Sequence, residues 1–157
     1  MKSIKYIKGD ATAPKQDGNK IIVHVCNDIG GWGRGFVLAL SAKWKDPETN
    51  YRDWANSKEN FELGAIQPVK VENDLWVINM IGQRDTKLAK DGTPPIRYEA
   101  VQLGINKVAR FALENNASVH MPRIGCGLAG GDWNQIEPIL LDELSSKEID
   151  VTVYDFE

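Results

Sequence analysis

The sequence predicts an α/β fold in which helices cover both faces of a mixed, mostly parallel sheet. Short apolar runs alternate with segments of helical periodicity, and this alternation is typical of such sheets. The run at residues 20–26 (KIIVHVC) is rich enough in β-branched residues to be buried on both faces. With 157 residues and 42% hydrophobic content, the chain is expected to form one domain over residues 1–157, without a linker.

Local patterns predict the other elements. Short apolar or alternating runs predict further strands at residues 4–7 (an edge strand), 65–71, 75–81, 118–121 and 151–154. Helices are expected at residues 36–44, 51–58, 96–115 and 133–144. The longest is expected to face the sheet with Val101, Leu103, Ile105, Val108, Phe111 and Leu113. Turn signals indicate that DPETNY (residues 46–51) ends the first helix, that residues 72–74 close a hairpin and that residues 83–95 form an exposed loop.

Charge and composition narrow the possible partners. The net charge of −3 comes from 19 basic and 22 acidic residues mixed along the chain, so no basic stripe can follow a nucleic-acid backbone. The N-terminus lacks the apolar core of a signal peptide, and no stretch approaches the roughly twenty apolar residues that span a bilayer. We therefore expect a soluble, cytoplasmic monomer that binds neither membranes nor specific nucleic-acid sequences.

The two cysteines, Cys26 and Cys126, form neither a CxxC pair nor a Cys/His array. This spacing predicts neither a zinc site nor a disulfide framework, and it fits a reducing compartment. The sequence shows no metal-ligating cluster, so we expect no metal and no cofactor. Any activity is expected to persist in the presence of a chelator.

Two glycine clusters are the strongest functional signal. GGWGRG (residues 30–35) and GCGLAGG (residues 125–131) each join a buried strand to a helix, at the sheet edge where α/β proteins bind ligands. Glycines there let the backbone approach an anion and turn its N–H groups towards it, and the helix dipole favours negative charge. Glycine-rich turns can also serve only as tight connections. Two facing clusters favour a ligand with two linked phosphates.

Features that the loops lack exclude several enzyme classes. Neither loop carries GxxxxGK[ST], and neither matches GxGxxG with an acidic residue about twenty positions later. Kinases, GTPases and ordinary dehydrogenases are therefore disfavoured. The residue six positions after Cys126 is Asp132 and not arginine, which disfavours a cysteine phosphatase and leaves Cys126 as a small loop residue.

Four motifs in this order resemble the macrodomain family over nearly the whole chain: GDAT (residues 9–12), IIVHVCNDIGGWGRGFVLAL (21–40), MPRIGCGLAGGDW (121–133) and VTVYDF (151–156). The chain is most similar to the branch that includes the ADP-ribose 1''-phosphate phosphatases and the terminal ADP-ribose protein glycohydrolase. The resemblance implies a three-layer α/β/α sandwich that binds ADP-ribose or a close derivative.

The resemblance also implies roles for individual residues. Asp10, beside the Ala11 amide, would accept a hydrogen bond from the adenine amine, although this carboxylate could also cap a turn. Tyr154 would stack on adenine, Asn27 would hold the distal ribose and Trp32 would cover it. The other residues implied in ligand binding lie in the two loops: Gly31, Gly33, Arg34, Gly35, Phe36, Ile124, Gly125, Cys126, Gly127, Leu128 and Ala129.

Three side chains are candidates for catalysis. His24 has an ordinary pKa near neutrality, but a histidine in a buried strand is more often a core residue. Asp132 could orient a water or cap the following helix. Lys70 is near the lysine that the glycohydrolases of this branch use, but the position expected for their aspartate is Ala129. His120 is expected to be structural.

Three functions remain open on these residues. The first is hydrolysis of ADP-ribose 1''-phosphate, with His24 as acid or base and Asp132 placing the water. The second is removal of ADP-ribose from modified macromolecules, for which Lys70 and Asp132 matter. The third is binding of free or protein-linked ADP-ribose without chemistry.

Overall fold

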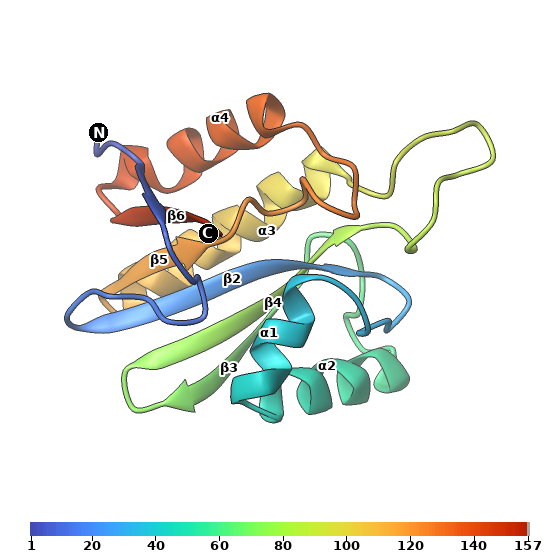
Figure 1. Ribbon diagram of the computed structural model, residues 1–157, viewed down its shortest axis with the longest axis horizontal. Coiled ribbons are helices and arrows are strands. Elements are labelled where there is room, and N and C mark those ends of the chain that lie inside the picture. The colour runs from blue at the N-terminus through green and yellow to red at the C-terminus, as the bar shows by residue number, and fades with distance from the viewer. Residues whose placement is uncertain (157) are drawn as a thin grey trace.

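The computed structural model describes residues 1–156, which form a six-stranded sheet between two layers of helices (Figure 1). The strands are β1 (Lys5–Lys8), β2 (Asn19–Asn27), β3 (Ile66–Glu72), β4 (Leu75–Gln83), β5 (Ala117–Met121) and β6 (Val151–Asp155). The helices are α1 (Phe36–Lys43), α2 (Asp46–Ser57), α3 (Tyr98–Glu114) and α4 (Trp133–Glu143), followed by the short 3-10 turn Ser145–Lys147. The predicted α/β class is confirmed.

The sheet order is β1-β6-β5-β2-β4-β3, and all neighbouring strands are parallel except β3 and β4. The predicted hairpin is confirmed, since β3 and β4 pair antiparallel around a tight turn. β2 pairs with β5 on one side and with β4 on the other, which places it at the centre of the sheet. Parallel strands send their following loops to one edge, so the loops after β5, β2 and β4 emerge side by side.

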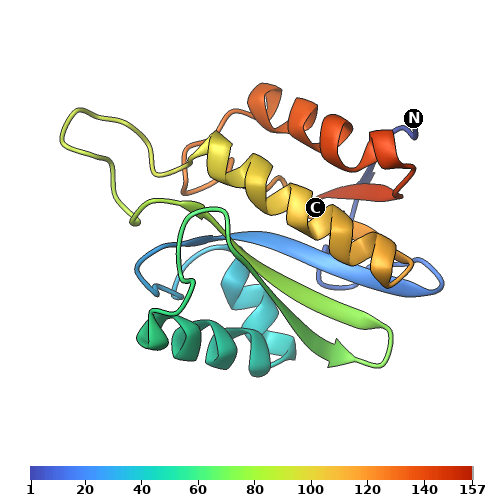
Figure 2. The same cartoon turned by 180° about the vertical axis from the view of Figure 1, so that it is seen from behind.

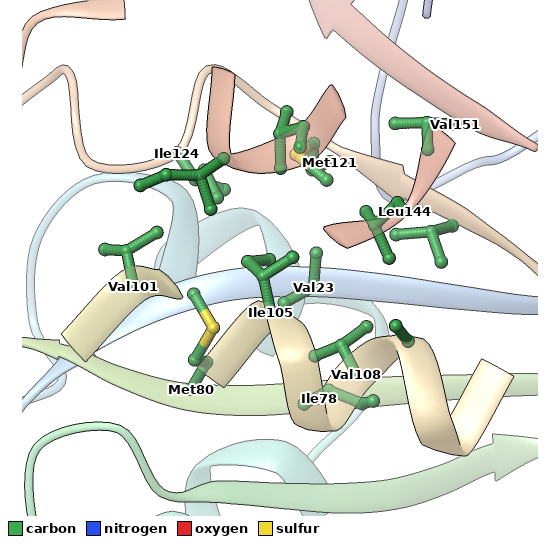
Figure 3. Packing of buried hydrophobic residues seen from close by; sticks show 14 of the residues in the cluster. Val23, Ile78, Met80, Val101, Ile105, Val108, Met121, Ile124, Leu144 and Val151 are labelled. Atoms are coloured by element: carbon green, nitrogen blue, oxygen red, sulfur yellow. The ribbon is translucent and has the colours of Figure 1, made fainter. Parts of the chain in front are cut away.

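Helices α3 and α4 cover one face of the sheet, and α1 and α2 cover the other (Figure 2). On β2, Ile21 and Val23 pack towards α3, whereas Ile22 packs towards α1 and α2, as the two-residue period of a strand requires. Figure 3 shows the larger core, where Ile105 and Val108 of α3 lie against the sheet. Because both faces are covered, the central strand is apolar along most of its length.

The turn signal at residues 46–51 was wrong. This segment begins α2 and does not simply end α1; Trp44, in extended conformation, separates the two helices. Pro47 lies in the first turn of α2, where a missing N–H costs little, and Asp46 and Glu48 are favourable beside the positive end of the helix dipole. The same residues that interrupt one helix therefore start the next.

The predicted apolar face of α3 was only partly right. Val101, Ile105 and Val108 are fully buried, but Leu103 and Leu113 are 57% and 55% exposed. Small residues complete the buried stripe, and Gly104 lies so close to Met80 that an added Cβ would collide with its side chain. Within residues 1–156, no helix has the length and apolar character needed to cross a bilayer.

These burials predict a difference between two truncations on the same helix. Ile105→Ala should lower the free energy of unfolding by roughly 3 kcal/mol, because it leaves a cavity in the core. Leu113→Ala should lower it by less than about 1 kcal/mol, because that side chain already contacts solvent. Urea denaturation of both variants measures the difference, and equal losses would contradict this assignment of the buried stripe.

Candidate functional site

A cleft of about 580 Å³ lies at the carboxyl edge of the parallel strands. The loops after β2, β4 and β5 meet at this end of the sheet, on the right in Figure 1. Both glycine clusters line the cleft, so the structure brings together the two loops that the sequence singled out. Gln83, the last residue of β4, forms a third wall together with Thr86 and Lys87 of the following loop.

The first loop is held in place by Asn27, the last residue of β2. Its Oδ1 accepts hydrogen bonds from the N–H groups of Ile29 and Gly31, at 3.1 and 2.9 Å, and from the hydroxyl of Tyr51 at 2.9 Å. Its Nδ2 donates to the Gly31 carbonyl at 2.9 Å. Asn27 lines the cleft and is 7% exposed, so most of its hydrogen-bonding capacity shapes the loop.

The second loop is a compact turn that depends on glycine. The Gly131 N–H donates to the Gly125 carbonyl at 2.7 Å, and the Gly130 N–H donates to the Gly127 carbonyl at 3.0 Å. Gly125 and Gly130 have φ of 73° and 74°, in the region that side chains disfavour. A Cβ at Gly131 would collide with the Gly125 carbonyl oxygen. The loop can therefore close only with glycine at these positions.

Both loops present backbone N–H groups that find no acceptor within residues 1–156. This set comprises Gly33, Arg34, Gly35, Phe36, Gly125, Gly127, Leu128 and Ala129. All of these residues line the cleft. The Phe36 N–H also belongs to the first turn of α1, where the helix dipole is positive. Two rows of unpaired donors in one cleft are suited to bind an anion with several oxygens.

The charged side chains of the cleft are all cationic. Arg34, Lys87 and Arg123 line it, and no aspartate or glutamate does. Arg123 makes a bidentate contact with Asp155, at 2.8 and 3.0 Å, and lies over the rings of Tyr6 and Trp133. Arg34 and Lys87 form no ion pair with any residue of 1–156. The cleft is therefore locally positive in a protein of net charge −3.

Comparison with known proteins identifies the family. A Bacteroides thetaiotaomicron protein of unknown function superimposes with a TM-score of 0.97 at 61% identity, covering 98% of each chain. A macrodomain protein from Streptomyces coelicolor superimposes with a TM-score of 0.88 at 52% identity, covering 98% of this chain and 99% of that one. The chain is a macrodomain. No family model matches it.

Curated relatives of this macrodomain carry different names. The zebrafish (Danio rerio) chromodomain-helicase-DNA-binding protein 1-like is 32% identical over 97% of this chain, which corresponds to 15% of that protein. The ADP-ribose 1''-phosphate phosphatase of Lodderomyces elongisporus is 26% identical, covering 98% of this chain and 99% of the relative. Human ADP-ribose glycohydrolase OARD1 is 24% identical, covering 96% of this chain and 90% of the relative.

His24 lies in the wall of the macrodomain cleft but is only 2% exposed. Its Nε2 lies 2.6 Å from Oδ1 of Asn79, whose Nδ2 donates to the Pro47 and Gln67 oxygens. Oδ1 is therefore the acceptor, and His24 carries its proton on Nε2. Burial lowers the pKa of His24 from 6.5 to about 4. The imidazole is neutral at pH 7, with its Nε2 proton committed to Asn79.

Lys70 does not line the cleft, so its catalytic role stays a prediction that the geometry does not support. It pairs with Trp76 across the hairpin, and Trp76 pairs with Ile21 near the start of β2. Because β3 runs antiparallel, Lys70 lies about six residues from the cleft end of β2, which corresponds to roughly 20 Å. Its ammonium lies 5.2 Å from the Trp76 ring. The lysine that lines the cleft is Lys87.

Asp132 is the N-cap of α4. Its Oδ1 accepts from the Asn134 N–H at 2.9 Å, and its own N–H donates to the Tyr98 hydroxyl at 3.0 Å. The side chain is exposed beside the second loop but does not line the cleft. Cys126, in that loop, is half-buried, and burial raises the pKa of its thiol. A protonated thiol fits its interpretation as a small loop residue.

Two aromatic residues are more buried than the sequence indicated. Trp32 is 6% exposed and donates from Nε1 to Ser41 at 2.8 Å, so it lines the cleft as part of the core. Tyr154 is 5% exposed, and its hydroxyl lies 2.7 Å from Nδ1 of the buried His120. This burial leaves Tyr154 little surface for stacking on adenine. The exposed aromatic side chain just after β6 is Phe156, which is 84% exposed.

Asp10 and Ala11 follow β1, near the opposite end of the same sheet edge and outside the cleft lining. Asp10 Oδ1 accepts from the hydroxyl and N–H of Thr12, at 2.7 and 2.8 Å, and the hydroxyl contact is the main cause of its lowered pKa. The carboxylate is exposed and ionised, and its other oxygen is available to a ligand. Ala11 is buried, at 4% exposure.

Sequence reasoning missed several residues of the cleft. Gln83 ends β4 in register with Asn27, and Thr86, Lys87 and Arg123 also line the cavity. The loop after β4 was recognised only as exposed, because its composition carries no motif. Its position beside a glycine loop follows from strand order, which the sequence alone does not fix. Within residues 1–156, no group of three or more His, Cys, Asp or Glu side chains is placed to hold a metal ion.

The buried histidines predict acid sensitivity. Burial lowers the pKa of both His24 and His120 from 6.5 to about 4, so between these pH values the unfolded chain takes up protons that the folded chain does not. Stability should be full above pH 6.5 and fall towards pH 4, by about 2 kcal/mol per histidine at pH 5. His24→Gln should remove about half of this loss. Urea denaturation from pH 7 to 5 tests this, and a pH dependence unchanged in the variant would contradict the assigned pKa of His24.

Proposed function

We propose that this macrodomain binds ADP-ribose in its cleft and removes by hydrolysis a group linked to C1'' of the distal ribose. The observation that carries the proposal is the pair of glycine loops with unpaired N–H groups around one cleft, whose charged side chains are all cationic. A diphosphate offers several negative oxygens to such donors. Family membership and the names of the relatives support the same ligand.

The strand order sets the direction of the proposed ligand. Asp10 follows β1 at one end of the carboxyl edge, and Gln83 ends β4 near the other. Adenine is proposed to lie towards Asp10 and Phe156, the diphosphate between the glycine loops, and the distal ribose towards Asn27. Four strand spacings separate β1 from β4, which is roughly 19 Å, so the ligand would bind in an extended conformation.

The first proposed reaction is hydrolysis of ADP-ribose 1''-phosphate. Water attacks the phosphorus, the bond between phosphorus and the C1'' oxygen breaks, and that oxygen takes a proton to give ADP-ribose. The Lodderomyces relative, which matches over its full length, is named for this reaction. Asp132 is proposed to orient the water. His24, neutral and bound to Asn79, is proposed to position Trp32 and Phe36, whose rings lie 5.4 and 6.0 Å away.

The second candidate is release of ADP-ribose from a modified macromolecule. The relative named ADP-ribose glycohydrolase supports it, and the exposed residues after β4 leave the ribose end of the cleft accessible. If the chain releases neither phosphate nor ADP-ribose, it is a binding module. The monomeric state and the cytoplasmic location stay predictions.

Filling the cleft should abolish binding. Gly33 and Gly127 line it, lack positive φ, and have no atom within 4 Å of an added Cβ. Gly33→Val and Gly127→Val should therefore fold normally but weaken ADP-ribose binding more than about tenfold, because valine occupies the space of the diphosphate. Ala42→Val, on the exposed side of α1, is the control. Calorimetric titration measures the affinities, and unchanged affinity in both glycine variants would place the ligand elsewhere.

Removing the charge of Asp132 should distinguish a role in hydrolysis from its role as the N-cap of α4. Asparagine caps helices as well as aspartate, so Asp132→Asn should change stability by only a few tenths of a kcal/mol. If Asp132 orients the water, kcat for phosphate release should fall roughly 100-fold. Phosphorus NMR follows the reaction, with ADP-ribose binding as the control. Full turnover in this variant would leave Asp132 as a cap alone.

The two proposed reactions can be distinguished by supplying each substrate separately. ADP-ribose 1''-phosphate should give inorganic phosphate in the first case, and a protein modified on carboxylates should release ADP-ribose in the second. Lys70→Ala should have less than about a twofold effect on either rate, because this lysine lies at the other end of the sheet. A large loss of activity would instead support a catalytic role for Lys70.

A further inference from the structure

The base of the loop at residues 84–95 is a built part of the cleft. The Asp85 N–H donates to the Asp28 carboxylate at 2.7 Å, and the Arg84 N–H donates to the Pro95 carbonyl at 2.8 Å. The Thr86 methyl lies beside Gly31 of the first loop, 3.6 Å from the position of a Cβ there. The tip of the loop projects away from the body (Figure 1), while Thr86 and Lys87 stay against the cleft.

Lys87 is a cation that the proposed diphosphate does not need. The loops that follow β5, β2 and β4 emerge in that order, and the Thr86 methyl lies beside Gly31 of the first glycine loop, so Lys87 enters the cleft from the β4 side. The diphosphate has the backbone N–H groups of both glycine loops and Arg34. Lys87 lies on the side of Gln83, beyond the proposed ribose, and pairs with no carboxylate of residues 1–156.

We propose that Lys87, assisted by the Thr86 hydroxyl, binds a second anion beyond the distal ribose, namely a phosphate monoester on C1''. This inference rests on the proposed function and makes Lys87 a specificity-determining residue of the same site. A dianionic phosphate gains a charge-assisted contact there that the hydroxyl of plain ADP-ribose does not gain. The protein should therefore prefer ADP-ribose 1''-phosphate to ADP-ribose.

The loop provides its own control. Lys90 belongs to the same exposed segment but does not line the cleft. Lys87→Gln and Lys90→Gln change the net charge equally. Comparing them therefore distinguishes a direct contact of Lys87 with the ligand from the effect of the protein's overall charge. Lys87→Arg retains the positive charge at the site. Both replaced residues, Lys87 and Lys90, are exposed, so all three variants are expected to fold normally.

The experiment compares the affinities of the two ligands. Each ligand is titrated against fluorescent ADP-ribose bound to the protein, and the displacement is measured before turnover begins. Phosphorus NMR confirms that the phosphate ester of ADP-ribose 1''-phosphate is still intact. The unaltered protein should bind ADP-ribose 1''-phosphate roughly fivefold to tenfold more tightly than ADP-ribose. Lys87→Gln should abolish this preference while the affinity for ADP-ribose stays within about twofold. Lys87→Arg and Lys90→Gln should retain the preference for ADP-ribose 1''-phosphate. In every protein that shows this preference, 0.5 M salt should reduce it.

The outcomes distinguish the two proposals. Binding of neither ligand by the unaltered protein would overturn the proposed function itself. Three outcomes would overturn only the role of Lys87. The unaltered protein could bind both ligands equally, the preference could persist in Lys87→Gln, or it could be lost in Lys90→Gln as well. Loss of preference in Lys87→Arg would show that charge at this position is not what selects the phosphate.

Discussion

The site depends on the placement of β2 between two parallel neighbours. Because β2 pairs in parallel with β5 and β4, the loops that follow these three strands lie side by side at one edge of the sheet. Burial on both faces fixes the register of β2 against its neighbours. At its last residue the pattern changes from apolar to polar. The Asn27 side chain then holds the first loop through three hydrogen bonds and accepts a fourth from Tyr51 of α2. The geometry of the cleft is thus set by the core and not by the loops alone.

The proposed binding through backbone N–H groups would explain how an acidic protein holds an anion. The net charge of −3 describes the whole surface, but the acidic residues lie outside the cleft lining. Peptide donors carry no counter-charge and are already oriented, so little reorganisation accompanies binding. Asp155 neutralises Arg123 at one end, whereas Lys87 stays unpaired at the other, which makes the two ends chemically different.

The sequence predicts best the features that depend on neighbouring residues. β2, the hairpin and the two glycine loops each have a local signature of β-branched runs or turn residues. The residues whose environment the sequence did not indicate depend on the fold. Leu103 and Leu113 fit helical spacing but face solvent, and Tyr154 is enclosed because its hydroxyl reaches His120. Lys87 carries no motif at all, since only strand order brings it to the first glycine loop.

The environment of His24 bears on how such a cleft could catalyse hydrolysis. A general acid or base works best with a pKa near the operating pH, and burial moves His24 well below it. Its Nε2 proton is also committed to Asn79, so a proton transfer would leave a buried acceptor unpaired. Rate enhancement would then have to come from orientation and from donors fixed around the charge that develops on the leaving oxygens. The same N–H groups and cations that are proposed to bind the ligand would provide those donors, so binding and catalysis would draw on one set of contacts.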